Sequence, residues 1–138
     1  MKYNTMEDLK EKIREFCEKS GIIFVYLFGS SVEDQGNLSS DLDIGIYLED
    51  PEGICLLELH SEFSKIFCRD KIDIVVLNKV SLLMQFKIIQ KGKLIYCQDE
   101  LKRIRYETKI MSLYHDRRYY YKRHIQRSLE RIAKEGIL

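Results

Sequence analysis

The sequence predicts a single α/β domain, in which a small β-sheet is flanked by helices and a long helix closes the chain. Short apolar runs with the character of strands alternate with segments whose apolar residues recur at helical spacing. The length of 138 residues is typical of one domain and suffices for a hydrophobic core without disulfides. No linker, repeat or low-complexity segment divides the chain. We therefore expect one domain over residues 1–138, with a core from about residue 5 to 97 and a last helix from about 99 to 135.

The composition is balanced in charge. The chain has 23 Lys and Arg against 22 Asp and Glu, a net charge of +1, which argues for neither a nucleic-acid nor a membrane partner. Its four cysteines lack the spacings of zinc ligands, so we expect reduced, mostly buried thiols. Residues 1–12 are charged and do not resemble a signal peptide, and the longest apolar run, 22–28, is too short to span a bilayer. We expect a cytoplasmic protein without a membrane partner.

The first half of the chain reads as a helix and two strands. Apolar residues at helical spacing predict a helix over Asn4–Ser20, stopped by Gly21. The run Ile22–Phe28 has no polar alternation and is typical of a strand buried on both faces, which Gly29-Ser30 ends. A second strand over residues 41–48 alternates, so its apolar residues share one face and its two aspartates share the other.

The second half alternates between helices and strands. Apolar periodicity predicts a helix from about Glu52 to Cys68, and Lys71–Leu77 reads as a third strand. Ser81 caps a helix that Gly92 ends, and residues 94–96 form a short edge strand. Asp99 caps a long helix to about residue 135. One apolar stripe of that helix comprises Leu101, Ile104, Thr108 and Met111, and an offset stripe comprises Tyr114, Tyr121 and Ile125.

Three carboxylates mark a candidate metal site. Asp41 and Asp43 share one face of the second strand, and Asp73 lies in the middle of the apolar third strand. If these strands are neighbours, carboxylates about 4 Å apart repel by roughly 4 kcal/mol per pair at an effective dielectric near 20. A divalent cation removes that conflict, and Mg²⁺ prefers such oxygen ligands.

The small residues Gly29 and Ser30 are a candidate phosphate loop. Glycine lets the backbone approach a triphosphate, the serine offers a hydroxyl, and backbone N–H groups bind anions. Each feature also has an ordinary explanation on its own. The glycine can end a strand, Asp41 and Asp43 can lie at a solvated edge, and Asp73 can pair with Lys71 or Arg69. Their occurrence together and in this order favours a metal site for phosphoryl or nucleotidyl transfer.

The spacing of these residues carries a family resemblance. Gly29-Ser30, ten further residues and Asp41-Leu42-Asp43, followed by the segment 71–75, resemble the DNA polymerase beta nucleotidyltransferase superfamily. The short length and the tail are similar to its minimal nucleotidyltransferase (MNT) branch, also called the MntA-type antitoxins. The tail features are Leu77-Asn78, the segment 86–92, Leu94-Ile95-Tyr96, Arg103, Tyr106 and Tyr114-x-Asp116. The resemblance covers nearly the whole chain.

The resemblance implies a nucleotidyltransferase fold of the α/β (α+β) class, with a small mixed sheet flanked by helices. It implies two Mg²⁺ ions as cofactors and ATP as nucleotide donor. Carried over by position, Asp41, Asp43 and Asp73 would ligate the metals, with Asp73 also helping to deprotonate the acceptor hydroxyl. Gly29 and Ser30 would hold the triphosphate. The implied partner is a HEPN-domain ribonuclease toxin, on which a tyrosine receives AMP from ATP.

The chain departs from the family at Val32-Glu33-Asp34, where many members have a small residue followed by Arg-Gly. An acidic pair beside a triphosphate weakens nucleotide binding unless it points to solvent or to metal. Two alternatives to the protein adenylyltransferase therefore stay open. One is an antitoxin that binds the HEPN toxin without catalysis. The other is nucleotidyl transfer to a small molecule such as an aminoglycoside, which the lack of a second substrate-binding domain disfavours.

Basic residues crowd the predicted last helix, together with Tyr119, Tyr120 and Tyr121. A solvated helix face, an RNA-binding face and a protein-binding face all fit this composition. Arginine and aromatic side chains together are typical of protein interfaces. We expect a partner surface and no direct contact with nucleic acid.

Overall fold

A computed structural model describes residues 6–29 and 42–135 of the chain. Its centre is a four-stranded sheet in the order β3-β2-β1-β4, formed by β1 (Ile22–Phe28), β2 (Leu42–Leu48), β3 (Ile72–Val76) and β4 (Lys93–Cys97). β1 pairs antiparallel with β2 and with β4, whereas β2 and β3 run parallel. The sheet is therefore mixed, as the resemblance implies. The continuous apolar run of β1 is explained by its central position, since its first five residues are buried.

Two helices cover one face of this sheet. α1 (Met6–Ser20) and α3 (Leu56–Phe67) pack their apolar stripes against the alternate residues of β2 and β3 that face them. Phe63 of α3 is fully buried and meets Phe16 of α1 edge to face, with ring centroids 5.2 Å apart. Full burial of such a side chain contributes roughly 1.5–3 kcal/mol, so this layer is the main hydrophobic core.

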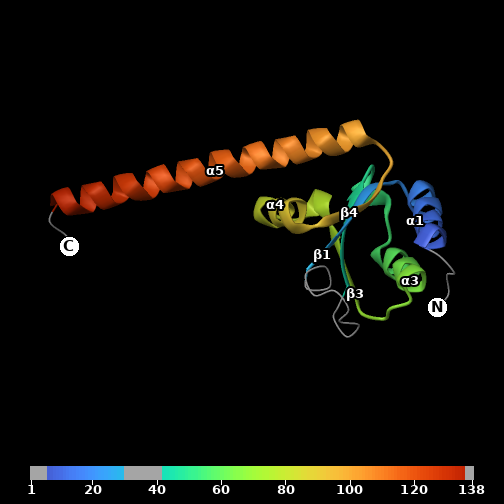
Figure 1. Ribbon diagram of the computed structural model, residues 1–138. Helices are drawn as coiled ribbons and strands as arrows, with labels where there is room; N and C mark the ends of the chain where they lie inside the picture. The colour runs from blue at the N-terminus through green and yellow to red at the C-terminus, as the bar shows by residue number, and fades with distance from the viewer. Residues whose placement is uncertain (1–5, 30–41, 136–138) are drawn as a thin grey trace.

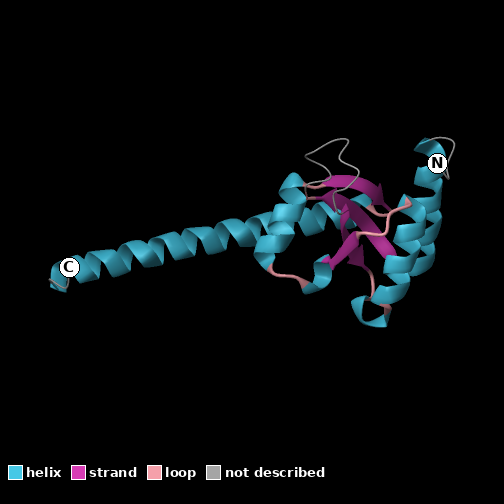
Figure 2. Cartoon of the chain, turned by 90° about the horizontal axis from the view of Figure 1, so that it is seen from below, coloured by secondary structure: helices cyan, strands magenta, loops and turns pink. Residues whose placement is uncertain are grey.

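α4 (Leu82–Lys91) and the first half of α5 (Glu100–Glu135) cover the other face. Tyr47 of β2 stacks on Phe24 of β1 with centroids 4.7 Å apart, and Tyr106 of α5 packs on both rings. The strands thus lie between two helical layers, as the two views show (Figure 1 and Figure 2). The aspartates of β2 and β3 belong to this second face, because the alternate residues Leu42, Ile44 and Ile72 belong to the first.

The predicted helix ends are mostly confirmed. Ser81 accepts a hydrogen bond from the backbone N–H of Met84 and caps α4, which ends at Gly92. Asp99 accepts one from the N–H of Lys102 and caps α5. Gly21 follows α1 with a φ of +73°, the left-handed conformation that glycine adopts at a helix stop.

Two helix predictions need correction. The helix expected from about Glu52 begins at Leu56 instead, because Pro51–Gly53 form a 3₁₀ turn capped by the carboxylate of Asp50. On α5 the stripe that includes Leu101, Ile104 and Met111 does not face the core. The packed side chains of α5 lie between those positions: Arg103, Tyr106, Glu107, Ile110 and Tyr114.

The cysteines are free, as expected, but the expectation that most are buried is wrong. Cys17 is buried in α1, Cys55 and Cys68 are exposed, and Cys97 is intermediate. Within the described ranges, no helix combines the length and the apolar character that crossing a membrane requires.

Candidate functional site

Gly29 ends β1 directly beside a carboxylate of β2. Its φ is +85°, and a Cβ built on it would lie 2.0 Å from Oδ2 of Asp43. A side chain at position 29 would therefore be strained in its backbone and would displace the Asp43 carboxylate. Glycine here allows the end of one strand and the acid of the next to approach each other closely.

Asp43 and Asp73 lie side by side on neighbouring strands. They are paired in the parallel register of β2 and β3, so both side chains are on the same face of the sheet. Strands in a sheet are about 4.8 Å apart, which sets the scale of the distance between these positions. A hydrogen bond of 3.1 Å from the N–H of Leu42 to the carbonyl of Lys71 holds the pair together at this end.

The two carboxylates differ in environment. Asp43 is half-buried in a central strand, whereas Asp73 is exposed in an edge strand. Among the described residues Asp73 forms no salt bridge, so the ordinary explanation by pairing with Lys71 or Arg69 does not apply. Two acids in register at this spacing repel each other, by about 1 kcal/mol because water screens the exposed Asp73. Their oxygen atoms are the donors that a hard divalent cation prefers.

Gly29, Asp43 and Asp73 are thus the three predicted site residues that the structure brings together. Ser30 and Asp41 lie outside the described residues, as do Glu33 and Asp34. In the part of the chain that is described, no three Asp, Glu, His or Cys side chains cluster as a metal site would require. The donor set fits a cation through two of the predicted ligands, and the third stays a prediction.

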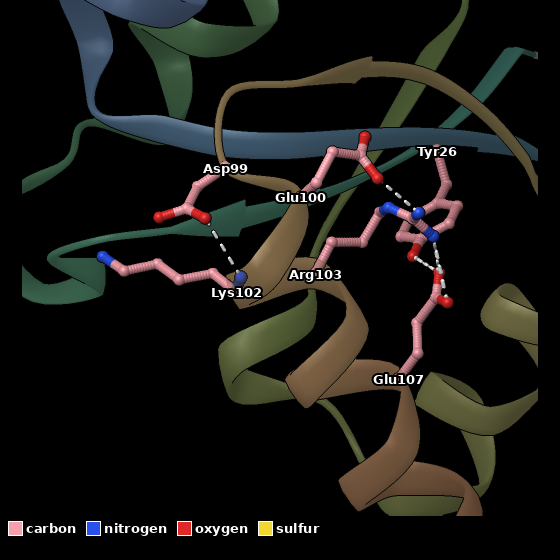
Figure 3. A network of polar contacts seen from close by, with 6 residues as sticks. All are labelled: Tyr26, Asp99, Glu100, Lys102, Arg103 and Glu107. Carbon is pink, nitrogen blue, oxygen red and sulfur yellow. Dashed lines mark hydrogen bonds and ion pairs between the residues drawn. The ribbon is translucent and has the colours of Figure 1, made fainter.

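A polar network that connects β1 to α5 was not predicted from the sequence. The hydroxyl of Tyr26, in the strand that ends at Gly29, donates a hydrogen bond to the carboxylate of Glu107 on α5 (Figure 3). Arg103 donates two further bonds to Glu107, at 3.0 and 3.1 Å, and one of 2.6 Å to Glu100. The sequence signals were a tyrosine inside an apolar strand and acids three residues before and four after an arginine.

The protonation states of this network are fixed by its contacts. Burial, and then the hydrogen bond to Glu107, raise the pKa of Tyr26 well above its ordinary value. The carboxylate of Glu100, opposed by partial burial and assisted by Glu107, raises the pKa of Arg103. Tyr26 therefore stays neutral and Arg103 stays charged. Together with Glu107, these residues attach α5 to β1.

Two tail residues that carry the resemblance also attach α5 to the body. The hydroxyl of Tyr106 donates a 2.6 Å hydrogen bond to Gln85 of α4, and burial raises the pKa of this tyrosine. Tyr114 stacks on Phe86 of α4 with ring centroids 3.7 Å apart. Their role in the structure is to position the helix.

A groove of about 880 Å³ lies at the other end of the sheet. Its wall includes Ile23 and Leu48, which are at the opposite ends of their strands from Gly29 and Asp43. Lys102, Arg105 and Lys109 of α5 line its rim. This groove is separate from the paired carboxylates.

The fold and the site define a class of protein. A mixed sheet with paired acids on adjacent parallel strands, beside a glycine at a strand end, is suited to metal-assisted transfer of a phosphoryl or nucleotidyl group. The chain matches the family described as polymerase beta, nucleotidyltransferase, over residues 11–101. It belongs to this nucleotidyltransferase family.

Solved structures share its fold. A chain of a toxin–antitoxin crystal structure with AMP-PNP is 20% identical, with a TM-score of 0.68 over 87% of this chain and 98% of that one. A chain of the tri-AMPylated Shewanella oneidensis HEPN toxin in complex with MNT antitoxin is 19% identical, with a TM-score of 0.64 over 91% and 99%. A chain of an MntA-HepT toxin–antitoxin structure is 20% identical, with a TM-score of 0.64 over 90% and 99%. The comparison with curated proteins found no match.

Proposed function

We propose that this chain is an ATP-dependent protein adenylyltransferase that acts as an antitoxin, with a HEPN-domain ribonuclease toxin as its partner and substrate. The observation that carries the proposal is the pairing of Asp43 with Asp73 in register, next to the close approach of Gly29. Membership of the nucleotidyltransferase family supports the reaction type. The likeness in fold to chains of complexes titled with AMP-PNP and with an AMPylated HEPN toxin supports the donor and the acceptor.

In this proposal Asp41, Asp43 and Asp73 hold two Mg²⁺ ions, while Gly29 and Ser30 bind the triphosphate of ATP. Bound divalent cations supply neutralisation of the charge that develops on the phosphate oxygens. The open backbone at Gly29 admits the phosphates, because no Cβ stands between the end of β1 and the carboxylate of Asp43. In the same proposal Asp73 accepts the proton of an incoming hydroxyl, and its exposure at the sheet edge supports this role.

The proposed reaction joins a tyrosine oxygen to the α-phosphorus of ATP. The bond between the α-phosphorus and the oxygen that leads to the β-phosphate breaks, and pyrophosphate leaves. The tyrosine proton passes to a carboxylate of the site. We further propose that the helices and strands form one domain with α5 as its C-terminal helix, and that the protein acts in the cytoplasm, where ATP is available.

The test is AMP transfer to the proposed HEPN-domain partner. The native chain, ATP and Mg²⁺ should add the mass of one AMP per modified tyrosine, as measured by intact mass spectrometry. Asp43→Asn should abolish the transfer, because it removes a ligand charge at the paired position. Asp70→Asn, which removes an exposed aspartate just before β3, serves as the control and should leave transfer unchanged. A partner that is neutralised by the native chain without gaining AMP would overturn the proposal.

One sequence observation favours a second candidate function. Glu33 and Asp34 stand at sequence positions where many members of the resembled family have Arg-Gly, and an acidic pair weakens nucleotide binding, which favours an antitoxin that neutralises by binding alone. In that case Asp41→Ala combined with Asp43→Ala would still protect cells that express the toxin. Loss of protection in the double variant excludes this alternative.

A further inference from the structure

The second half of α5 extends beyond the rest of the molecule. α5 spans Glu100–Glu135, which at 1.5 Å per residue is about 54 Å. Its last ring contacts with the body are those of Tyr114 and His115 with Phe86. Past that point the helix runs into solvent in both views (Figure 1 and Figure 2). We call residues 116–135 the arm. It lies outside the segment matched by the family, which ends at residue 101.

The apolar seam that holds α5 to the body continues along the arm. Tyr121, Ile125 and Ile132 follow Tyr114 by 7, 11 and 18 positions, close to two, three and five helical turns. They therefore lie on the same side of the helix as Tyr114, which packs on α4. Tyr121 and Ile125 are 61% and 57% exposed. The arm thus has an apolar face like that of a packed helix, but the rest of the molecule does not cover this face.

The arm is also strongly basic. It carries seven cations against the three carboxylates Asp116, Glu130 and Glu135, a net charge of +4. The cations are Arg117, Arg118, Lys122, Arg123, Arg127, Arg131 and Lys134. None of them forms a salt bridge with a described residue. Most of the stability of a helix in a protein comes from tertiary packing of its apolar face, so a complementary surface would stabilise the arm.

We propose that the arm docks in an apolar groove rimmed by carboxylates on the HEPN-domain partner, with the seam residues Tyr121, Ile125 and Ile132 as its anchors. The identity of the partner rests on the proposed function. A second copy of the chain is disfavoured, because two arms of net charge +4 repel each other. RNA would use the cations and would stack bases on Tyr121, but it would leave the aliphatic side chains of Ile125 and Ile132 exposed.

The arm provides a matched pair of variants for the test. Tyr119 is two positions before Tyr121, about 200° around the helix, so it lies on the opposite side. The two tyrosines are similarly exposed, at 66% and 61%. Calorimetric titration of the full chain with the proposed HEPN-domain partner should show a Kd at least roughly tenfold higher for Tyr121→Ala than for the native chain. Tyr119→Ala should stay within about twofold of native, and raising the salt concentration should weaken binding by every variant.

Far-UV circular dichroism establishes that both variants keep their helix, and Tyr121→Phe should retain near-native affinity because the ring remains. Equal affinities for Tyr121→Ala and Tyr119→Ala would overturn the proposal. Loss of affinity for a 30-nucleotide RNA by Tyr121→Ala, with partner binding intact, would assign the arm to RNA. A dimer of the native chain that Tyr121→Ala converts to monomer, with partner binding intact, would assign it to a second copy. Both results would overturn the proposal.

Intact mass spectrometry of the same mixtures separates this inference from the proposed function. Weakened partner binding by Tyr121→Ala, in mixtures where even the native chain adds no AMP, supports the docking and refutes the adenylyl transfer. If Tyr121→Ala transfers AMP at the native rate when the partner concentration is below the Kd, the result supports the transfer and refutes the docking.

Discussion

Replacement of Gly29 by alanine tests two effects of a side chain at this position: strain in the backbone and displacement of the Asp43 carboxylate. Gly29 has a φ of +85°, and a left-handed backbone costs an L residue roughly 1–2 kcal/mol. The added Cβ would also meet Oδ2 of Asp43 at 2.0 Å. That oxygen is at the end of a side chain, so rotation of the Asp43 side chain can relieve the contact. We therefore expect a modest loss of stability and a large loss of activity.

Gly21→Ala is the matched control. Its φ of +73° imposes a similar backbone cost, but among the described residues, its chain neighbours aside, no atom lies within 4 Å of the Cβ that would be added. Both variants should lose roughly 1–2 kcal/mol of unfolding free energy, seen as a few degrees in Tm by circular dichroism. The displaced carboxylate in Gly29→Ala should reduce AMP transfer about 100-fold, the penalty typical of a 1 Å misplacement in an active site. Gly21→Ala should keep near-native transfer when assayed well below its Tm.

The comparison has a clear failing result. Equal residual transfer by the two variants would show that the contact between position 29 and Asp43 plays no part in the reaction. A Gly29→Ala variant that is much less stable than Gly21→Ala would show that the carboxylate cannot rotate away.

Three further predictions concern the site, the network and the core. Without divalent cation, Asp73→Asn should raise the unfolding free energy by about 1 kcal/mol of relieved repulsion, seen as a higher Tm. It should also reduce the rise in Tm that Mg²⁺ and ATP produce in a thermal-shift assay. A native-like rise in Tm with Mg²⁺ and ATP would count against the paired site. Tyr26→Phe removes the hydrogen bond to Glu107 and should cost about 1.5 kcal/mol in urea unfolding, whereas Tyr47→Phe should cost little. Burial raises the pKa of Cys17 from 9.0 to about 12. As the pH rises, the thiol ionises in the unfolded chain before it ionises in the folded chain. Below pH 9 the unfolding free energy should therefore not depend on Cys17, and between pH 9 and 12 it should fall by up to about 1.4 kcal/mol per pH unit. Cys17→Ala should reduce this slope.

The local patterns that sequence reasoning used were reliable where burial is one-sided or complete. The run of β1 predicted a central strand because a strand covered on both faces has no reason to alternate. Alternation also put Asp43 on the face opposite the apolar residues of its strand, and the parallel register of β2 and β3 then sets Asp73 beside it. Strand pairing joins residues that are far apart in the sequence, however. The sequence alone therefore could not predict that these two strands are neighbours.

The error on α5 occurred because periodicity admits more than one solution there. α5 carries apolar residues around much of its surface, and the stripe with Leu101 and Ile104 matched helical spacing as well as the packed one. The actual packed face contains Arg103 and Glu107, which a hydrophobic pattern excludes. These charged side chains can pack because they satisfy each other and the hydroxyl of Tyr26. A pattern that scores apolar residues alone cannot detect such a network.

The Tyr26 network also connects the two parts of the molecule for which we make proposals. Tyr26 lies on the strand that ends at Gly29, and Glu107 lies on the helix that continues as the arm. A single helix, α5, carries both the docking seam and the residues that contact β1. A partner that docks on the arm is therefore held at a fixed position relative to Gly29 and Asp43. Transfer to a protein hydroxyl depends on such positioning, since the acceptor must reach the α-phosphate in line. Loosening α5 at Tyr26 should therefore impair transfer more than it impairs binding of the partner.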